Sequence, residues 1–292
     1  MKILLFGKNG QLGWELRRSL APLGQITALD YEDVDLLNAD LLRQTIAELR
    51  PEIIVNASAY TDVDGAQKDR EKAFAINATA PQIMAEQAKL LDAPLIHYST
   101  DYVFEGTKGE PYTEQDPPRP VNVYGASKLA GEDAVKSAAK AFLILRTAWL
   151  YSMRGSNFVT KVLQWARKHE KLHIVDDQVS NPTWARILAQ LTAHVLGRGD
   201  GYFRERSGLY HLTGSGHASR YDWAKEILKY DPRPEEQKTT EVVRAATSDI
   251  PTPARRPLFS ALDSDLFSQV FGLRAPAWEH ELKLALADSI SH

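Results

Sequence analysis

Short apolar runs alternate with amphipathic segments along the first half of the chain. The apolar runs occupy Lys2–Phe6, Gln25–Leu29 and residues 52–56, 95–99 and 141–146. Such runs are typical of parallel strands that are buried on both faces. Between them, apolar residues recur roughly every third or fourth position, which is the period of a helix with one buried face. The alternation predicts an α/β fold, a Rossmann-like doubly wound parallel sheet with right-handed crossovers.

The helical pattern is carried by residues 14–20, 38–50, 70–91 and 125–140. Asn38 stands where it can cap the second of these helices, because its side chain can accept a hydrogen bond from a free amide of the first turn. Pro81 predicts a break in the long segment, since proline lacks the amide hydrogen and its ring clashes with the preceding turn. A sixth strand is expected at residues 172–175.

Composition and charge narrow the range of functions. The 292 residues are 43% hydrophobic and 25% charged, with a net charge of −3 and no cysteine. No block of Lys and Arg marks a nucleic-acid or acidic-membrane surface, so neither partner is expected. Without cysteine, the chain has no disulfide and no thiol nucleophile. The N-terminus lacks a signal peptide and no apolar run is long enough to span a membrane, so we expect a cytoplasmic protein.

A glycine-rich turn follows the first apolar run. Gly7, Gly10 and Gly13 lie between the expected strand and the helix at residues 14–20. Glycines allow a tight turn and a close approach of the backbone to a pyrophosphate, and the helix N-terminus supplies free amides. The spacing differs from the simplest Gly-x-Gly-x-x-Gly fingerprint, but the strand–turn–helix setting predicts a dinucleotide site.

An acidic residue ends the second apolar run. Asp30 lies about 20 residues after the glycines, where a carboxylate can accept hydrogen bonds from an adenosine ribose. It would repel a 2′-phosphate and no arginine follows it, which slightly favours NADH over NADPH. The alternative is a solvated loop aspartate. Asp35 and Leu36, in the next loop, are candidates for adenine contacts.

Candidate acid–base chemistry rests on Tyr124 and Lys128. Residues four apart share a helix face, so the phenol and the ammonium are expected to point the same way. A nearby ammonium lowers a tyrosine pKa, and such a tyrosine can exchange a proton with a carbonyl or an alcohol. Tyr221 and Lys225 repeat the spacing, but no glycine turn or hydroxyl-ended strand stands in a comparable relation to them. That second pair is expected to be a surface pair.

Several of these residues fall at the carboxyl ends of expected strands, where ligands of open α/β sheets bind. They are Gly7, Asp30, Ala59, Thr100 and Trp149. Their coincidence predicts a single active site at that edge of the sheet.

The strand–helix rhythm breaks up near residue 150. Beyond it, short elements are separated by loops rich in Pro and Gly, at residues 177–183, 214–216 and 250–257. We therefore expect residues 1–150, with returns near 185–213, to form the dinucleotide-binding domain. Residues 151–184 and 214–292 are expected to form a smaller C-terminal lobe that covers the cleft and binds substrate.

The motifs together resemble a known family. The matching stretches are residues 7–15, 56–64, 98–104, 146–149 and 252–257. They are similar to stretches of the dTDP-4-dehydrorhamnose reductases, a family of the extended short-chain dehydrogenase/reductase superfamily. The glycine turn and the Tyr–Lys pair are superfamily signals. Ser99-Thr-Asp-Tyr-Val-Phe104 and Thr252-Pro-Ala-Arg-Arg-Pro257 are more specific.

The resemblance implies NAD(P)H-dependent reduction of the C4 keto group of dTDP-4-dehydro-6-deoxy-L-mannose to dTDP-L-rhamnose, a step in polysaccharide precursor synthesis. The implied catalytic residues are Thr100, Tyr124 and Lys128, of which Tyr124 and Lys128 also contact the cofactor. The implied cofactor positions are Gly10, Gln11, Leu12, Asp30, Asp35, Leu36, Ala59, Tyr60 and Thr61. The implied substrate positions are Thr100, Asp101 and Trp149. We add Arg255 and Arg256 as candidate diphosphate ligands, because guanidinium forks match phosphate oxygens.

One position departs from the family pattern. Some members are described with Mg²⁺ held by glutamates at a dimer contact, and Glu15 and Glu279 match such positions. Arg186 stands where a further glutamate is expected, and an arginine cannot ligate a cation. We therefore expect no metal here, and the hypothesis is that Arg186 pairs directly with the two acids. A homodimer is one assembly that the resemblance leaves open.

Two alternatives stay open at this point. The chain could be another sugar-nucleotide enzyme of the superfamily, an epimerase or a 4,6-dehydratase. Dehydratases need an acidic pair after the threonine, whereas Thr100-Asp101 is followed here by Tyr102. The chain could also be a non-catalytic NAD(P)-binding regulatory subunit, although it keeps Thr100, Tyr124 and Lys128.

Overall fold

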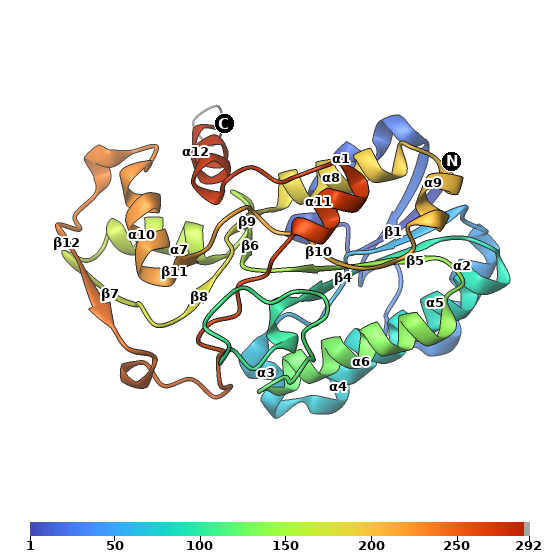
Figure 1. Cartoon of the computed structure of the whole chain (residues 1–292), viewed down its shortest axis with the longest axis horizontal. Coiled ribbons are helices and arrows are strands. Elements are labelled where there is room, and N and C mark those ends of the chain that lie inside the picture. The colour runs from blue at the N-terminus through green and yellow to red at the C-terminus, as the bar shows by residue number, and fades with distance from the viewer. Residues whose placement is uncertain (289–292) are drawn as a thin grey trace.

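A six-stranded parallel sheet forms the centre of the molecule (Figure 1). The structure, a computed structural model, describes residues 1–288. The strands lie in the order β10-β5-β4-β3-β1-β2, and every neighbouring pair is parallel. Their bounds are β1 Lys2–Phe6, β2 Gln25–Leu29, β3 Ile53–Asn56, β4 Leu95–Thr100, β5 Phe142–Thr147 and β10 Gly208–His211. The predicted doubly wound parallel sheet is confirmed.

Helices cover both faces of this sheet. They are α1 Gln11–Ser19, α2 Ala39–Leu49, α3 Val63–Lys68, α4 Arg70–Phe74, α5 Ala80–Leu90, α6 Val123–Ala138, α8 Ala185–Leu196, α9 Asp200–Glu205 and α11 Asp265–Phe271. Successive side chains of a strand point to opposite faces. Ile3 and Leu5 of β1 accordingly share a core with Leu16 of α1 and Leu188 of α8. The alternate residues of β1 pack on the other face, against α2 and α5.

A smaller lobe lies beside the sheet and has a core of its own (Figure 1). Its elements are β6 Leu150–Tyr151, α7 Phe158–Ala166, β7 Lys171–Val175, β8 Val179–Ser180, β9 Thr183–Trp184, β11 Ala218–Ser219, α10 Arg220–Lys229, β12 Glu241–Ala245 and α12 Trp278–Asp288. In place of the regular strand–helix alternation of the first half, the described part of this lobe has three short two-stranded sheets, β11–β8, β12–β7 and β6–β9.

Two local predictions need correction. The strand expected at residues 172–175 exists as β7, but it pairs with β12 in the smaller lobe. The sixth strand of the main sheet is β10, which lies beside β5. The segment 70–91 is interrupted by a π-helical turn at Ala75–Thr79, and Pro81 lies in the first turn of α5, directly after this interruption. The cap at Asn38 is confirmed, because its side chain accepts from the Leu41 amide.

Helix α6 carries Tyr124 and Lys128, and glycines let it approach neighbouring backbone closely. A Cβ built on Gly125 would lie 2.1 Å from the Tyr102 carbonyl oxygen, and one on Gly131 would lie 2.1 Å from the Asn77 carbonyl oxygen. Neither position has room for a methyl group. The start of α6 is thereby held against the turn that follows β4, and its middle against the π-helical turn.

Residues 1–288 contain no helix that combines the length and apolarity needed to cross a bilayer.

Replacement of Gly131 by alanine tests this close packing. Gly131→Ala should lower the free energy of unfolding by about 1–3 kcal/mol, because the new methyl group must displace the backbone at Asn77. Gly201→Ala is the matched control, since a Cβ there meets nothing within 4 Å; it should be neutral or stabilising by up to about 1 kcal/mol. Urea unfolding of both variants makes the comparison, and equal stabilities would contradict the packing described.

Candidate active site

A cavity of about 500 Å³ opens at the carboxyl ends of the strands. Its lining comes from the glycine turn, from the residue after β2 and the segment after β3, from the ends of β4 and β5 and the residues that follow them, and from α6. The residues are Gly7, Gly10, Gln11, Leu12, Asp30, Ala57, Ser58, Ala59, Thr61, Tyr98, Ser99, Thr100, Asp101, Tyr124, Lys128, Thr147, Ala148, Trp149 and Leu150. Because parallel strands end at one edge, residues distant in sequence meet here.

The glycine turn fits a pyrophosphate. Gly7 has φ +88°, in the left-handed region that favours glycine. A Cβ on Gly13 would lie 1.9 Å from the Gly7 carbonyl oxygen, so the turn folds directly onto the start of α1. Gly10 and Gln11 at the N-terminus of α1 line the cavity, where free amides and the positive end of the helix dipole favour an anion.

A second cavity of about 220 Å³ continues from the first, and both share Gly7, Asp30, Ser58 and Ala59. Asp35 and Leu36 line it, as a site for an adenine ring requires. The Asp30 carboxylate also accepts a hydrogen bond from the Asn9 amide at 2.8 Å. Asp30 therefore supports the glycine turn and faces the place expected for a ribose.

Asn77 holds the segment that contains Tyr60 and Thr61, and sequence reasoning missed it. Its side chain exchanges two hydrogen bonds with the Tyr60 backbone, at 2.8 and 3.0 Å, and donates a third to Ser127 at 3.0 Å. The residue lies in the π-helical turn, and π-bulges are frequent at functional sites. The only signal in the sequence is an asparagine inside a helical pattern, which does not reveal these distant partners.

Thr100 and Tyr124 meet in the cavity. The Thr100 hydroxyl lies beside the Tyr124 phenol in the cavity, and it donates to the Asp101 carboxylate at 3.0 Å. The other Asp101 oxygen accepts from Ser180 at 3.0 Å and from Ser260 at 2.6 Å. Asp101 thus ties the end of β4 to two segments of the smaller lobe. Burial raises the pKa of its carboxyl, against these hydrogen bonds.

The expectation that Lys128 lowers the pKa of Tyr124 is wrong. Burial removes water from the Tyr124 phenol and raises its pKa above the usual value, while the neighbouring Thr100 hydroxyl acts in the opposite direction. The Lys128 ammonium instead donates to the Tyr98 carbonyl oxygen at 2.7 Å. Burial lowers the pKa of Lys128 to about 8. Desolvation is the largest influence on the pKa of Tyr124 and of Lys128, and the spacing of two residues along a helix gives no information on how deeply they are buried.

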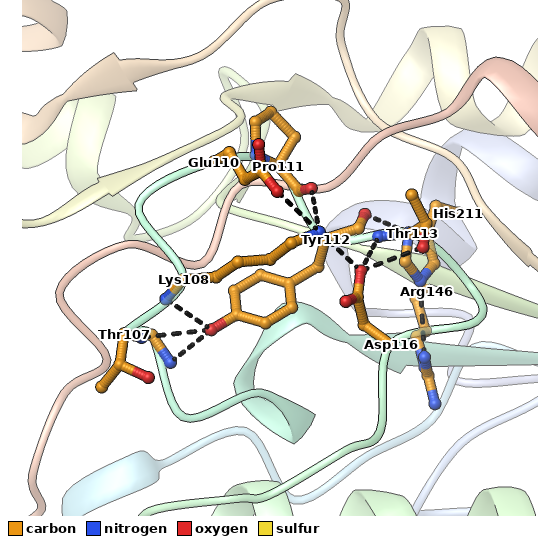
Figure 2. A network of polar contacts seen from close by, with 10 residues as sticks. Thr107, Lys108, Glu110, Pro111, Tyr112, Thr113, Asp116, Arg146 and His211 are labelled. Carbon is orange, nitrogen blue, oxygen red and sulfur yellow. Dashed lines mark hydrogen bonds and ion pairs between the residues drawn. The ribbon is translucent and has the colours of Figure 1, made fainter.

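A buried ion pair lies beneath these residues. Glu132, one turn beyond Lys128 on α6, is contacted by Arg146 of β5 at 2.7 and 2.8 Å. Glu132 also accepts from the Ser99 hydroxyl at 2.6 Å. Arg146 also contacts the His211 ring, and that ring contacts the Tyr112 carbonyl oxygen at 3.0 Å. Figure 2 shows these contacts of Arg146, His211 and Tyr112. The pair therefore joins α6, β4, β5, β10 and the loop before α6.

Trp149 lines the cavity with a strained backbone. Its φ is +36°, which is unusual for a bulky residue, and such strain is common at functional sites. Its ring stacks on Trp223 with centroids 5.4 Å apart. Arg220 lies over the Trp149 ring at 3.7 Å, a contact that sequence reasoning missed.

The arginines proposed from sequence as diphosphate ligands do not line the cavity. Arg255 is exposed, and its carbonyl oxygen accepts from the Asn122 side chain at 2.8 Å. Arg256 forms an ion pair with Asp64 at 2.8 Å. Tyr221 and Lys225 lie on α10 in the smaller lobe, with the ammonium 5.5 Å from the ring centroid, so they form no second acid–base site.

Arg186 pairs with acids, although one partner differs from the hypothesis. It contacts Glu15 at 3.3 Å and also Asp288, whereas the expected partner Glu279 is exposed on α12. Asp288 lies near the end of α12 and reaches the guanidinium in its place. Over residues 1–288, no group of three or more His, Asp or Glu side chains is arranged to hold a metal ion.

Comparisons with known proteins agree along the whole chain. A sequence profile described as RmlD substrate binding domain matches residues 1–290. The dTDP-4-dehydrorhamnose reductase of Burkholderia thailandensis is 42% identical over 300 residues, covering 100% of both chains. That of Escherichia coli K12 is 42% identical over 291 residues, covering 98% of this chain and 97% of the relative.

A solved structure shows the same arrangement. The dTDP-4-dehydrorhamnose reductase of Bacillus anthracis, in complex with NADP, superposes with a TM-score of 0.90 at 33% identity. The match covers 98% of this chain and 99% of the other.

Proposed function

The chain belongs to the dTDP-4-dehydrorhamnose reductase family of oxidoreductases, and from this premise we propose that it reduces the C4 ketone of dTDP-4-dehydro-6-deoxy-L-mannose to dTDP-L-rhamnose with NAD(P)H. The observation that carries the proposal is the contact between Thr100 and Tyr124 inside the cavity that also contains the glycine turn. A proton donor and a dinucleotide cradle then face one reacting carbon. When bound, the nicotinamide supplies a hydride to that carbon.

Negative charge builds on the ketone oxygen as the hydride arrives, and the protein must neutralise it. Tyr124 delivers the proton, which converts the oxygen into a hydroxyl. The raised pKa of Tyr124 keeps the phenol protonated until this step. Thr100 donates a second hydrogen bond to the same oxygen after its hydroxyl turns away from Asp101. The products are the alcohol and the oxidised cofactor.

Lys128 positions the nicotinamide ribose and does not itself transfer the proton. Its ammonium has three N–H donors, and one is used by the Tyr98 carbonyl oxygen. The remaining donors face the cavity, where they suit the hydroxyls of the nicotinamide ribose. The positive charge, held beside the site by the backbone, also favours the oxyanion that develops at the ketone.

The parts of the chain take the following proposed roles. Residues 1–150, with α8 and β10 from the returning segment, bind the dinucleotide. Residues 151–184 and 214–288, apart from α11, which packs on the main sheet, form the substrate-binding lobe, with Trp149 at the junction offering an apolar face to a sugar or base. A homodimer and a cytoplasmic location are further proposals, which rest on the family resemblance.

The alternatives predict different behaviour. In a 4,6-dehydratase the position of Tyr102 would carry an acid, whereas here its ring packs edge-on against Tyr124 at 5.8 Å. Epimerases and dehydratases recycle their cofactor without net loss. A regulatory subunit would bind the cofactor without turnover.

Cofactor oxidation separates these readings. With dTDP-4-dehydro-6-deoxy-L-mannose, the protein should oxidise NADH or NADPH in equal molar amounts to the product formed, followed by absorbance at the nicotinamide band. Asp30 predicts a modest preference for NADH. Because the structure of the Bacillus anthracis relative contains NADP, the assay is also run with NADPH. Binding of cofactor without stoichiometric oxidation of either would overturn the proposed function.

Removal of one phenol tests the proton donor. Tyr124→Phe should lower kcat by at least roughly two decades, because the ketone oxygen loses its general acid. Tyr221→Phe removes the phenol of the matching but unrelated pair and should leave kcat within about twofold of the parent. A Tyr124→Phe variant that keeps its rate, at unchanged cofactor affinity, would remove Tyr124 from the mechanism.

A further inference from the structure

Arg220 holds an unusual position at the start of α10. Its guanidinium stacks on the Trp149 ring at 3.7 Å and lies 4.7 Å from the Phe158 centroid. Trp149 in turn lines the proposed catalytic cavity, whereas Arg220 lies one side chain away from that lining, against the Trp149 ring. The arginine is partly buried, so its charge lies in a low-dielectric aromatic setting beside the candidate substrate residues.

This guanidinium has no carboxylate counter-ion. Among residues 1–288, no Asp or Glu lies within ion-pair distance of it, whereas the buried Arg146 has Glu132 at 2.7 Å and Arg167 has Asp231 at 2.8 Å. Asp101 acts on Arg220 only through space, and its oxygens are engaged by Thr100, Ser180 and Ser260. The polar group beside Arg220 is the uncharged Tyr102 hydroxyl.

Such an arrangement is costly for the protein alone. A charge taken out of water needs a partner of opposite sign, and burial lowers the pKa of Arg220 to about 10. Arg256 makes the charge imbalance greater, because its own charge also acts on Arg220. Arg256 itself is paired with Asp64. Of these two arginines, only Arg220 lacks an acidic partner within ion-pair distance among residues 1–288.

We propose that Arg220 binds the diphosphate of the nucleotide sugar, and that this anion is its missing counter-ion. The inference rests on the proposed function and names the subsite that holds the substrate's charged group. A guanidinium fork donates paired hydrogen bonds to phosphate oxygens. Stacking on Trp149 fixes the plane of the fork, so the diphosphate and the sugar beside it are placed relative to Thr100 and Tyr124. Arg255 is exposed and lacks such a setting.

Binding of dTDP and of thymidine, measured by calorimetry on the full chain, tests the inference. The parent protein should bind dTDP more tightly than thymidine. Arg220→Met should lower dTDP affinity by about tenfold to a hundredfold, because a charge-assisted paired contact is lost. Its thymidine affinity should stay within about twofold. Arg220→Lys should fall in between, since an ammonium keeps the charge without the fork.

Arg244→Met is the matched control. Arg244 also stacks on an aromatic ring, Tyr221 at 4.1 Å, but it pairs with Asp176. This variant should bind dTDP like the parent. The NADPH affinity of every variant reports whether the dinucleotide domain is intact.

The outcomes separate the inference from the proposed function. Unchanged dTDP affinity in Arg220→Met, or an equal loss for dTDP and thymidine, would overturn the role of Arg220 and leave the proposed function standing. A parent protein that shows no preference for dTDP over thymidine would overturn the inference and also count against a nucleotide-sugar substrate.

Discussion

The buried ion pair between Glu132 and Arg146 is the constraint on which the site depends. Both side chains are almost fully inaccessible to water, and a buried charge is tolerated only when its partner is held in good geometry. Glu132 lies on α6, Arg146 on β5, and Ser99 of β4 donates to the same carboxylate. A shift of α6 along the sheet would break these contacts and leave a charge unpaired. The helix that carries Tyr124 and Lys128 is therefore fixed in register with the strand that ends in Thr100.

Close backbone packing adds to this constraint. Gly125 and Gly131 leave α6 no room to move away from the turn after β4 or from the π-helical turn. Asn77 then connects the same helix to the Tyr60 backbone. On the other side, Asp101 fastens the end of β4 to Ser180 and Ser260 of the smaller lobe. The glycine turn, Tyr124 and the smaller lobe thus meet at one strand end, which is the arrangement that the proposed reduction requires.

Much of this could be predicted from sequence, for identifiable reasons. Apolar runs and helical periods are local signals, and the rule that parallel strands end at one edge placed Gly7, Asp30, Thr100 and Trp149 together. The predictions that were wrong or absent concern contacts between residues far apart in the sequence. The segment 172–175 has a strand pattern, but a pattern does not name its partner strand. Arg220 and Asn77 gain their roles from residues far along the chain. The pKa of Tyr124 depends on burial, which outweighs what the spacing to Lys128 suggested.

The position of an isotopic label tests the central claim most directly. The account holds that one site transfers hydride to the ketone carbon while the phenol protonates its oxygen. With NADPH that carries deuterium at the transferable position of the nicotinamide, the product sugar should carry deuterium at C4 and at no neighbouring carbon, in equal molar amount to the cofactor oxidised. Deuterium at another carbon of the sugar, or retained in the cofactor during turnover, would contradict the account.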